Sequence, residues 1–556
     1  MIVSRFRSRS GFGLMLILLV AGALRLFQLG AADVITDEAL IAFRSIGYID
    51  FFASPYQTTP YEWFSDVPRW AMLSFHDHPP LVFLLQHWFF MLFGESVLTL
   101  RLPFALAGTA SVYLLYFVGR KLFNERTGLI AAALLAVSPY HVWISRIGLQ
   151  ESVVIFFSLL TLYFFIKSFD DYRFWYGWGV ALGLAFLTKY TAFILLPVFL
   201  IYLVWKERHL FKQIHVWLAV ALALLVFSPV LVYNASLFSE RGHFDLQFSH
   251  VFGQQVEAWQ SLPGKIQAGG IADRLFDLAP RFYQGLLLPM SLLLISALAY
   301  LLMKFFRSAR DDQKPLLLLG LLFDFYLLSF LLTGPASRFV VVITPIIALI
   351  AGWFIAERSR WLRISLVSGI IIFELFFTVD TLFLVQPVGA EDVTYSRLRR
   401  DSAFWGYHQL DQFIEATVSN KRPAVSFSTR YRFLEDIKQQ ALTRAANNEP
   451  AGILFVYDQN MDDLAALWVF HRQLVYRGWP VLTADQFMEQ DRGIWAAQGI
   501  TDIYFVDVIN DMVLQRPLDE RTTAADLLAE ELNDIEPTII KRPDGRAVFA
   551  VYTISF

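Results

Sequence analysis

The sequence predicts a polytopic α-helical membrane protein that ends in a soluble α/β domain. Three observations predict this class: the composition, the recurrence of long apolar runs, and a change of composition near Pro387. Of the 556 residues, 56% are hydrophobic and only 17% are charged, which is more apolar surface than a soluble protein of this length carries. The formal net charge of -3 argues against a nucleic acid partner.

The chain contains no Cys. This excludes disulfides, iron–sulfur clusters, thiolate zinc sites and a cysteine nucleophile. A bound metal would therefore need His and carboxylate ligands. Missing Cys does not decide the compartment.

The N-terminus carries Arg5, Arg7 and Arg9 before an apolar run over residues 11–30. A cleaved signal peptide is one interpretation, since small residues follow at 21–23 and 31–32. The run is long enough to cross a bilayer, and many apolar runs follow it. We therefore expect a retained first span.

Basic clusters alternate with the apolar runs and set the topology. They occur in every second loop, on the side of the N-terminal arginines, which is the positive-inside pattern. This pattern predicts about eleven spans, a cytoplasmic N-terminus and an extracytoplasmic C-terminal domain. The expected location is the inner (plasma) membrane. The predicted spans are 11–30, 98–119, 128–145, 152–168, 174–188, 191–205, 214–234, 283–303, 315–333, 339–356 and 364–386.

One apolar segment, 79–93, is too short to be counted as a span. Counting it would place every later basic loop outside the cell. We expect an interfacial or re-entrant helix within a first external loop over 31–97, beside an amphipathic helix over about 37–52.

The chain leaves the membrane near Pro387 and becomes more charged. We divide it into a membrane domain, 1–390, and an extracytoplasmic domain, 391–556. From about Trp405, short strand-like runs alternate with helical stretches at 431–447 and 463–478, which predicts an α/β domain. It has no nucleotide-binding or nucleophile-elbow motif, so we assign it no chemistry; recognition of the acceptor is a hypothesis for it.

The candidate catalytic residues, Asp37 and Glu38, directly follow the first span. A helix cap is an equally good interpretation, because Thr36 and Asp37 are cap residues and Glu38 would lie in the first turn. Capping and catalysis are compatible. Charges at a membrane boundary are costly and tend to be functional, so this pair is the first candidate for chemistry on a lipid-linked substrate.

Other ionisable residues fall at span ends on the same predicted side: Arg146, Glu151, Lys189 and Arg338. Each has a simpler alternative. Arg146 and Glu151 could form a surface pair or a helix cap, Lys189 could be an interfacial anchor, and Arg338 could bind anionic headgroups. The position of Arg25, near the end of the first span, favours snorkelling of its side chain to the headgroups over a role in catalysis.

Three further polar features have open interpretations. His76, Asp77 and His78 could supply metal ligands, although polar residues before Pro79 more often form a loop. Asp324 and Glu374 fall inside predicted spans, where each is either a buried polar contact or a misplaced span edge. We derive no function from these two.

Six segments in register resemble a known family: RLFQLG…DEAL, HDHPPL, RLPFALAGTASVYLLYFVGRKLF, SRIGLQES, LTKYTAFILLP and SRFVVVITPIIALIAG. Over residues 10–385 the chain resembles the bacterial branch of the protein O-mannosyltransferase superfamily, which has the GT-C fold and includes the lipid A aminoarabinose transferases. The C-terminal domain resembles the family only as an extracytoplasmic appendage.

The resemblance implies roles for individual residues. Asp37 occupies the place of the acid at the catalytic centre, and Glu38 matches the acid that follows it. Glu151 stands where the family often has Asp, which lengthens the side chain. The remaining matches are Arg146, the basic lipid-phosphate contacts Lys189 and Arg338, and His78 in a His-Pro-Pro motif. Some relatives bind a divalent metal, which keeps His76 and His78 as weak ligand candidates; no cofactor is certain.

The expected function is transfer of a sugar from a polyprenyl-phosphate donor to an acceptor hydroxyl. Asp37 would act as general base and the anomeric carbon would invert. The acceptor stays open between a lipid, a glycan and a protein. A lipid-linked glycan polymerase or ligase is a close alternative, and a flippase or transporter of lipid-linked sugar is a more distant one.

Overall fold

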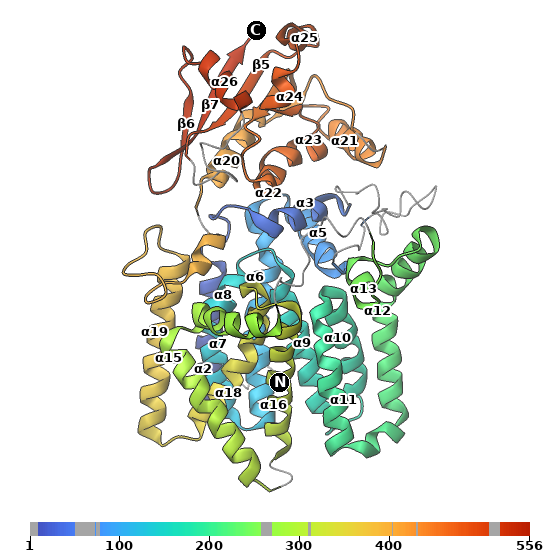
Figure 1. Cartoon of the computed structure of the whole chain (residues 1–556), viewed down its shortest axis with the longest axis vertical. Helices are drawn as coiled ribbons and strands as arrows, with labels where there is room; N and C mark the ends of the chain where they lie inside the picture. Colours follow the sequence, from blue (N-terminus) through green and yellow to red (C-terminus); the bar gives the residue numbers. More distant parts are fainter. Residues whose placement is uncertain are drawn as a thin grey trace. The chain divides into compact units, whose positions relative to one another are not determined.

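The computed structural model describes residues 9–49, 73, 78–256, 270–309, 313–402, 404–429, 432–510 and 523–556. The chain divides into two compact units (Figure 1). The first contains Met1–Gly30 and Asp50–Arg400, and the second contains Ala31–Ile49 and Asp401–Phe556. The second unit thus includes a segment, 31–49, that the sequence analysis assigned to the loop of the membrane domain.

The first unit is helical, and each predicted span coincides with a helix. Seven helices in the described part of the chain are long and apolar enough to cross a membrane, and the bent pair α7–α8 would make an eighth. Three other predicted spans are shorter apolar helices, at Ser10–Leu26, Phe174–Thr188 and Tyr190–Lys206. The predicted class, a multi-pass helical membrane protein with a C-terminal α/β domain, is confirmed.

The helices of this unit are α2 (Arg9–Leu26), α5 (Leu81–Phe93), α6 (Val97–Leu122), α7 (Glu125–Val137), α8 (Pro139–Ser145), α9 (Gln150–Ser168), α10 (Phe174–Thr188), α11 (Leu195–Lys206), α12 (Ile214–Arg241), α13 (Leu246–Val251), α15 (Ile271–Arg307), α16 (Gln313–Thr333), α17 (Ser337–Val340), α18 (Thr344–Ala356) and α19 (Arg360–Leu382). The 3₁₀ turns are η2 (Tyr190–Ile194), η3 (Arg208–Lys212), η4 (Val341–Ile343) and η5 (Arg397–Ser402), the last at the boundary between the units in sequence.

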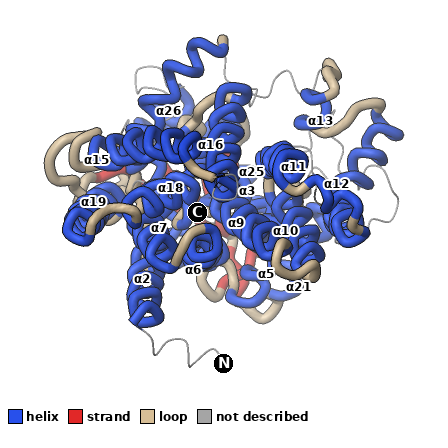
Figure 2. Tube along the Cα trace, turned by 90° about the horizontal axis from the view of Figure 1, so that it is seen from below, coloured by secondary structure: helices blue, strands red, loops and turns tan. Residues whose placement is uncertain are grey.

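Small residues allow the central helices to approach closely. A Cβ atom on Gly128 of α7 would collide with the backbone of α6 at Tyr116, and one on Gly352 of α18 would lie 2.8 Å from the backbone nitrogen of Ala131. Such contacts are the usual basis of helix packing in membranes. Figure 2 shows α6, α7 and α18 near the middle of the bundle, with α12 and α19 at opposite edges.

The second unit contains a five-stranded sheet in the order β4-β3-β5-β7-β6. β3 pairs in parallel with β4 and β5, whereas β7 runs antiparallel to β5 and β6. The strands are β3 (Ile453–Tyr457), β4 (Val481–Thr483), β5 (Asp502–Val508), β6 (Thr538–Lys541) and β7 (Ala547–Ser555). A separate parallel pair consists of β1 (Lys421–Pro423) and β2 (Glu449–Ala451). Apolar side chains of β3 and β5, such as Leu454 and Phe505, are completely buried in the core.

The helices of the second unit are α3 (Thr36–Gly47), α20 (Tyr407–Val418), α21 (Arg432–Arg444), α22 (Asp463–Ala466), the π-helical turn η6 (Leu467–His471), α23 (Arg472–Arg477), α24 (Ala484–Met488), α25 (Arg492–Ala497) and α26 (Thr523–Glu531). The amphipathic helix predicted over 37–52 is α3. Its apolar face is covered by this unit, because Phe43 is completely buried and its ring centroid lies 5.2 Å from that of Tyr476.

Candidate active site

Asp37 and Glu38 lie in the first turn of α3. The residue at the N-cap position is Ile35, whose side chain makes no capping hydrogen bond. Both acids are well placed to interact with the positive end of the helix, so their role as cap residues stays a prediction beside catalysis. Glu38 is buried, with 2% of its surface exposed, whereas Asp37 is only partly buried. Asp37 is thus the more accessible of the two carboxylates.

The backbone immediately before Asp37 is strained. Thr36 has a φ of 59°, in the left-handed region. A β-branched residue there costs about 1–2 kcal/mol, because Cβ approaches the following carbonyl oxygen. Such strain persists only where surrounding contacts impose it, and it concentrates at functional sites. The turn that presents Asp37 is therefore held by its neighbours.

The first unit brings together three of the predicted site residues. Lys189, which follows α10, forms an ion pair with Glu151 at the start of α9. The ammonium nitrogen of Lys189 also lies 5.0 Å from the ring centroid of Phe339, and the guanidinium carbon of Arg338 lies 5.2 Å from the same centroid. Two cations thus share one aromatic ring beside one buried carboxylate.

Arg146 is directed elsewhere. Its guanidinium donates hydrogen bonds to the carbonyl oxygens of Leu24, Arg25, Phe27 and Gln28, at the C-terminal end of α2. It also lies 4.5 Å from the ring centroid of Phe383. Within the described residues, no ion pair joins Arg146 to Glu151, so the interpretation of these two as a surface pair is wrong. A cation on the last carbonyls of a helix is a stabilising C-terminal contact.

The sequence favoured snorkelling of the Arg25 side chain to the membrane surface, and the structure shows that this expectation is wrong. Arg25 is completely buried and donates to the carbonyl oxygens of Leu135 and Ala136 and to Nδ1 of His141, at 2.7 Å. The physical reason is the break between α7 and α8, which are bent by 63°. A broken helix leaves carbonyl oxygens without helical partners, and in a membrane these need an internal donor.

A polar cluster next to Lys189 was not predicted from the sequence. Asp245 is completely buried and accepts hydrogen bonds from the Tyr190 hydroxyl at 3.0 Å and from Asn234 Nδ2 at 2.9 Å. Burial raises the pKa of the Asp245 carboxyl, against the hydrogen bonds that it accepts. Because Tyr190 follows Lys189 directly, the cluster fixes the backbone after this cation. The available signal was a polar pair, Asn234 and Asp245, at the end of a long apolar run.

The structure describes only part of the motif His76, Asp77 and His78. His76 and Asp77 lie outside the described residues, while His78 is described and partly buried. Within the part of the chain that the structure describes, no three His, Asp or Glu side chains are grouped as metal ligands.

The two acids inside predicted spans differ in their surroundings. Glu374 is 3% exposed and lies within α19, away from its ends, where it lines a small cavity together with Ser138 and Thr344. It is therefore a buried polar group rather than a misplaced span edge. Asp324, in the middle of α16, is exposed on the surface of the helix.

Comparisons with known proteins define the class of this fold. Residues 77–233 match the dolichyl-phosphate-mannose-protein mannosyltransferase family. The structure aligns over 98% of both chains with ArnT from Cupriavidus metallidurans bound to undecaprenyl phosphate, with a TM-score of 0.56 and 14% identity. It also aligns with the Archaeoglobus fulgidus oligosaccharyltransferase over 90% of this chain and 70% of that one, with a TM-score of 0.51 and 13% identity. The chain therefore has the GT-C fold, as the resemblance implied.

Curated relatives are similar over shorter regions. The putative mannosyltransferase YycA of Bacillus subtilis is 31% identical over 207 residues, which cover 36% of this chain and 28% of the relative. The undecaprenyl phosphate-alpha-4-amino-4-deoxy-L-arabinose arabinosyl transferase 2 of Pseudomonas fluorescens is 31% identical over 125 residues, 21% of each chain. This chain thus spans less than a third of the length of either relative. Both carry the names of enzymes that transfer a sugar.

Proposed function

We propose that this protein is an integral-membrane glycosyltransferase that moves a sugar from a polyprenyl-phosphate donor to an acceptor hydroxyl. The observation that carries the proposal is the arrangement of Lys189 and Arg338 on the ring of Phe339, in a chain with the GT-C fold. Two cations beside one ring suit a phosphate, which needs charge-assisted hydrogen bonds. Relatives named for undecaprenyl-phosphate and dolichyl-phosphate sugars support the lipid-phosphate donor.

In the proposed reaction, Asp37 accepts the proton of the acceptor hydroxyl as general base. The hydroxyl oxygen attacks the anomeric carbon while the bond from this carbon to the phosphate oxygen breaks, so the configuration inverts. The leaving lipid phosphate keeps the bonding electrons, and Lys189 and Arg338 stabilise its charge. Glu151 orients Lys189.

The test measures transfer of radiolabelled sugar from a polyprenyl-phosphate donor into lipid, glycan and protein fractions of a membrane extract. We expect Asp37→Asn to remain folded and to bind the donor but to be inactive. Near-normal transfer by this variant would exclude Asp37 as the base. Movement of the lipid donor across vesicles without bond cleavage would instead indicate a flippase.

A second variant tests the phosphate contacts. Arg338→Ala should weaken donor binding more than acceptor binding, with transfer reduced roughly 10²–10³-fold, as for the loss of a donor to a developing oxyanion. Arg307→Ala is the matched control, because Arg307 is an exposed cation of the same unit, in the last turn of α15. An equal loss of donor and acceptor binding in Arg338→Ala would indicate misfolding or a wrong assignment.

A further inference from the structure

The segment that carries Asp37 is anchored at its start by a buried carboxylate. Asp33 is 2% exposed, and its oxygens accept hydrogen bonds from the backbone amides of Trp405, Gly406 and His408, the last at 2.8 Å. These amides belong to the first turn of α20 and the residues before it. Unpaired amides at a helix N-terminus prefer an anionic acceptor. Asp33 therefore supplies the cap of α20 from a distant part of the chain.

The C-terminal end of α3 is anchored by a tyrosine. The hydroxyl of Tyr476, in α23, donates a hydrogen bond to the carbonyl oxygen of Phe43 at 2.6 Å. A Cβ atom on Gly47 would lie 2.7 Å from the Tyr476 ring, so only glycine fits there without a shift. Because Tyr48 adopts the left-handed conformation at the C-cap, the backbone turns away directly after this contact. Both ends of α3 are thus held by helices of the second unit.

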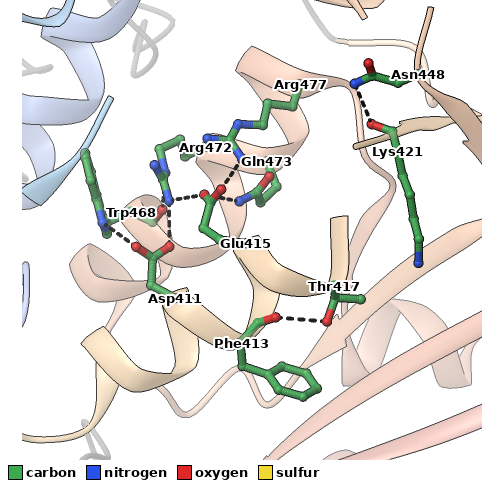
Figure 3. Close-up of polar contacts among 10 residues, drawn as sticks. All are labelled: Asp411, Phe413, Glu415, Thr417, Lys421, Asn448, Trp468, Arg472, Gln473 and Arg477. Atoms are coloured by element: carbon green, nitrogen blue, oxygen red, sulfur yellow. Dashed lines mark hydrogen bonds and ion pairs between the residues drawn. The ribbon is translucent and has the colours of Figure 1, made fainter. Parts of the chain in front are cut away.

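These two holding helices are linked to each other by a buried ion network (Figure 3). Arg472 of α23 is 2% exposed and contacts Asp411 of α20 at 2.6 Å and Glu415 at 2.7 Å. Glu415 also pairs with Arg477 and accepts a hydrogen bond from Gln473 at 2.9 Å. A buried pair of this kind is costly to break, since one partner would be left uncompensated. The network therefore makes α20 and α23 a rigid frame for α3.

We propose that one function of the C-terminal domain is to position the catalytic segment, with Asp33 and Tyr476 as positioning residues for Asp37. The proposal rests on the proposed role of Asp37 as the base. The network of Asp411, Glu415 and Arg472 fixes the frame, Asp33 and Tyr476 hold α3 on it, and the strained Thr36 presents Asp37.

The first test compares two single-atom deletions in the full-length protein. Tyr476→Phe removes the hydroxyl bonded to Phe43 and keeps the ring contact. Tyr457→Phe is the matched control, because it removes a hydroxyl bonded to His471 at 3.1 Å in the same domain. We expect kcat to fall about 10-fold in Tyr476→Phe, since small displacements of a catalytic group are costly, with an unchanged KM for the donor. Tyr457→Phe should keep kcat at a similar thermal stability.

Hydrolysis of the donor, measured without acceptor, distinguishes positioning of the base Asp37 from recognition of the acceptor. If Tyr476 positions the base, hydrolysis and transfer fall by the same factor in Tyr476→Phe, because both use Asp37. Loss of transfer with unchanged hydrolysis would overturn the proposal in favour of acceptor recognition. An equal loss of kcat in Tyr457→Phe would also overturn it, because general loosening of the domain would then be sufficient.

The second test does not depend on activity. Amide hydrogen exchange of the solubilised full-length chain is read on the peptide that contains Trp405, Gly406 and His408, whose amides donate to Asp33. We expect faster exchange in this peptide for Asp33→Asn, and no change for Asp534→Asn, an exposed carboxylate of the same unit. Wild-type exchange of this peptide in Asp33→Asn would overturn the anchor. If Asp37→Asn stays active while Asp33→Asn shows the faster exchange, the proposed function fails and the anchor stands.

Discussion

Lys189 and Glu151 form an ion pair in which the carboxylate side chain is 2% exposed and the ammonium side chain is 12% exposed. Removing both charges of a buried pair is often tolerated, whereas removing one leaves the other uncompensated. Mutations of Lys189 and Glu151 can therefore separate the effect of this pair on stability from the proposed contact of Lys189 with phosphate.

We expect Glu151→Gln to destabilise the protein by roughly 3–5 kcal/mol, the usual cost of breaking a buried pair. Lys189→Met should destabilise it similarly and should also abolish donor binding. The double variant should regain much of the stability but none of the donor binding. Denaturant unfolding and donor titration of the four proteins measure both quantities. Additive losses of stability would show that the two charges are not coupled.

Arg146 is expected to stabilise the end of α2. Its guanidinium donates to four carbonyl oxygens, and a lysine ammonium cannot reproduce that planar arrangement of donors. Arg146→Lys should therefore lower the free energy of unfolding by about 1–3 kcal/mol, as for buried acceptors left without a donor. The KM for the donor should stay unchanged. A higher KM at normal stability would instead indicate that Arg146 contacts the substrate.

Arg25 should be among the most sensitive positions of the first unit. Arg25→Met keeps the length and removes the donors to Leu135, Ala136 and His141. Unpaired carbonyl oxygens inside a membrane domain cost several kcal/mol together, so we expect poor folding and low yield in detergent. Met15→Leu, on the exposed face of the same helix, should be neutral and controls for expression. Wild-type yield and stability of Arg25→Met would contradict the role.

Hydrophobic periodicity and the alternation of basic loops were sufficient to predict the helical membrane unit and the α/β domain, because both signals are local in sequence. The partners of the charged residues were not predictable in this way. Arg25 bonds to carbonyls that are free only because a helix breaks at Ser138, and Asp33 caps a helix that begins about 370 residues later. Such contacts depend on tertiary packing, so sequence spacing alone suggested snorkelling for Arg25 and no role for Asp33.

Glu435 should make the second unit sensitive to acid. The hydrogen bond from Lys438, and then that from Gln439, lower the pKa of the Glu435 carboxyl from 4.5 to about 2. Lys438 contacts it at 2.7 Å, and the backbone amide of Thr429 also donates to it. In the unfolded chain the pKa of Glu435 is higher than in the folded chain, so the unfolded chain binds a proton more readily. The ionised carboxylate therefore stabilises the fold above about pH 4.5, and this stabilisation is lost as the pH falls towards 2.

The predicted outcome is a pH-dependent difference between wild type and Glu435→Gln. The variant should unfold at lower denaturant concentration near pH 6, and the gap should close as the pH approaches 2, because wild-type Glu435 is then protonated as well. Glu489→Gln controls for loss of a charge, since Glu489 is an exposed carboxylate in the same unit. It should give a small difference that does not change over this range. A gap for Glu435→Gln that stays constant from pH 6 to pH 2 would show that the contact with Lys438 does not require the ionised carboxylate.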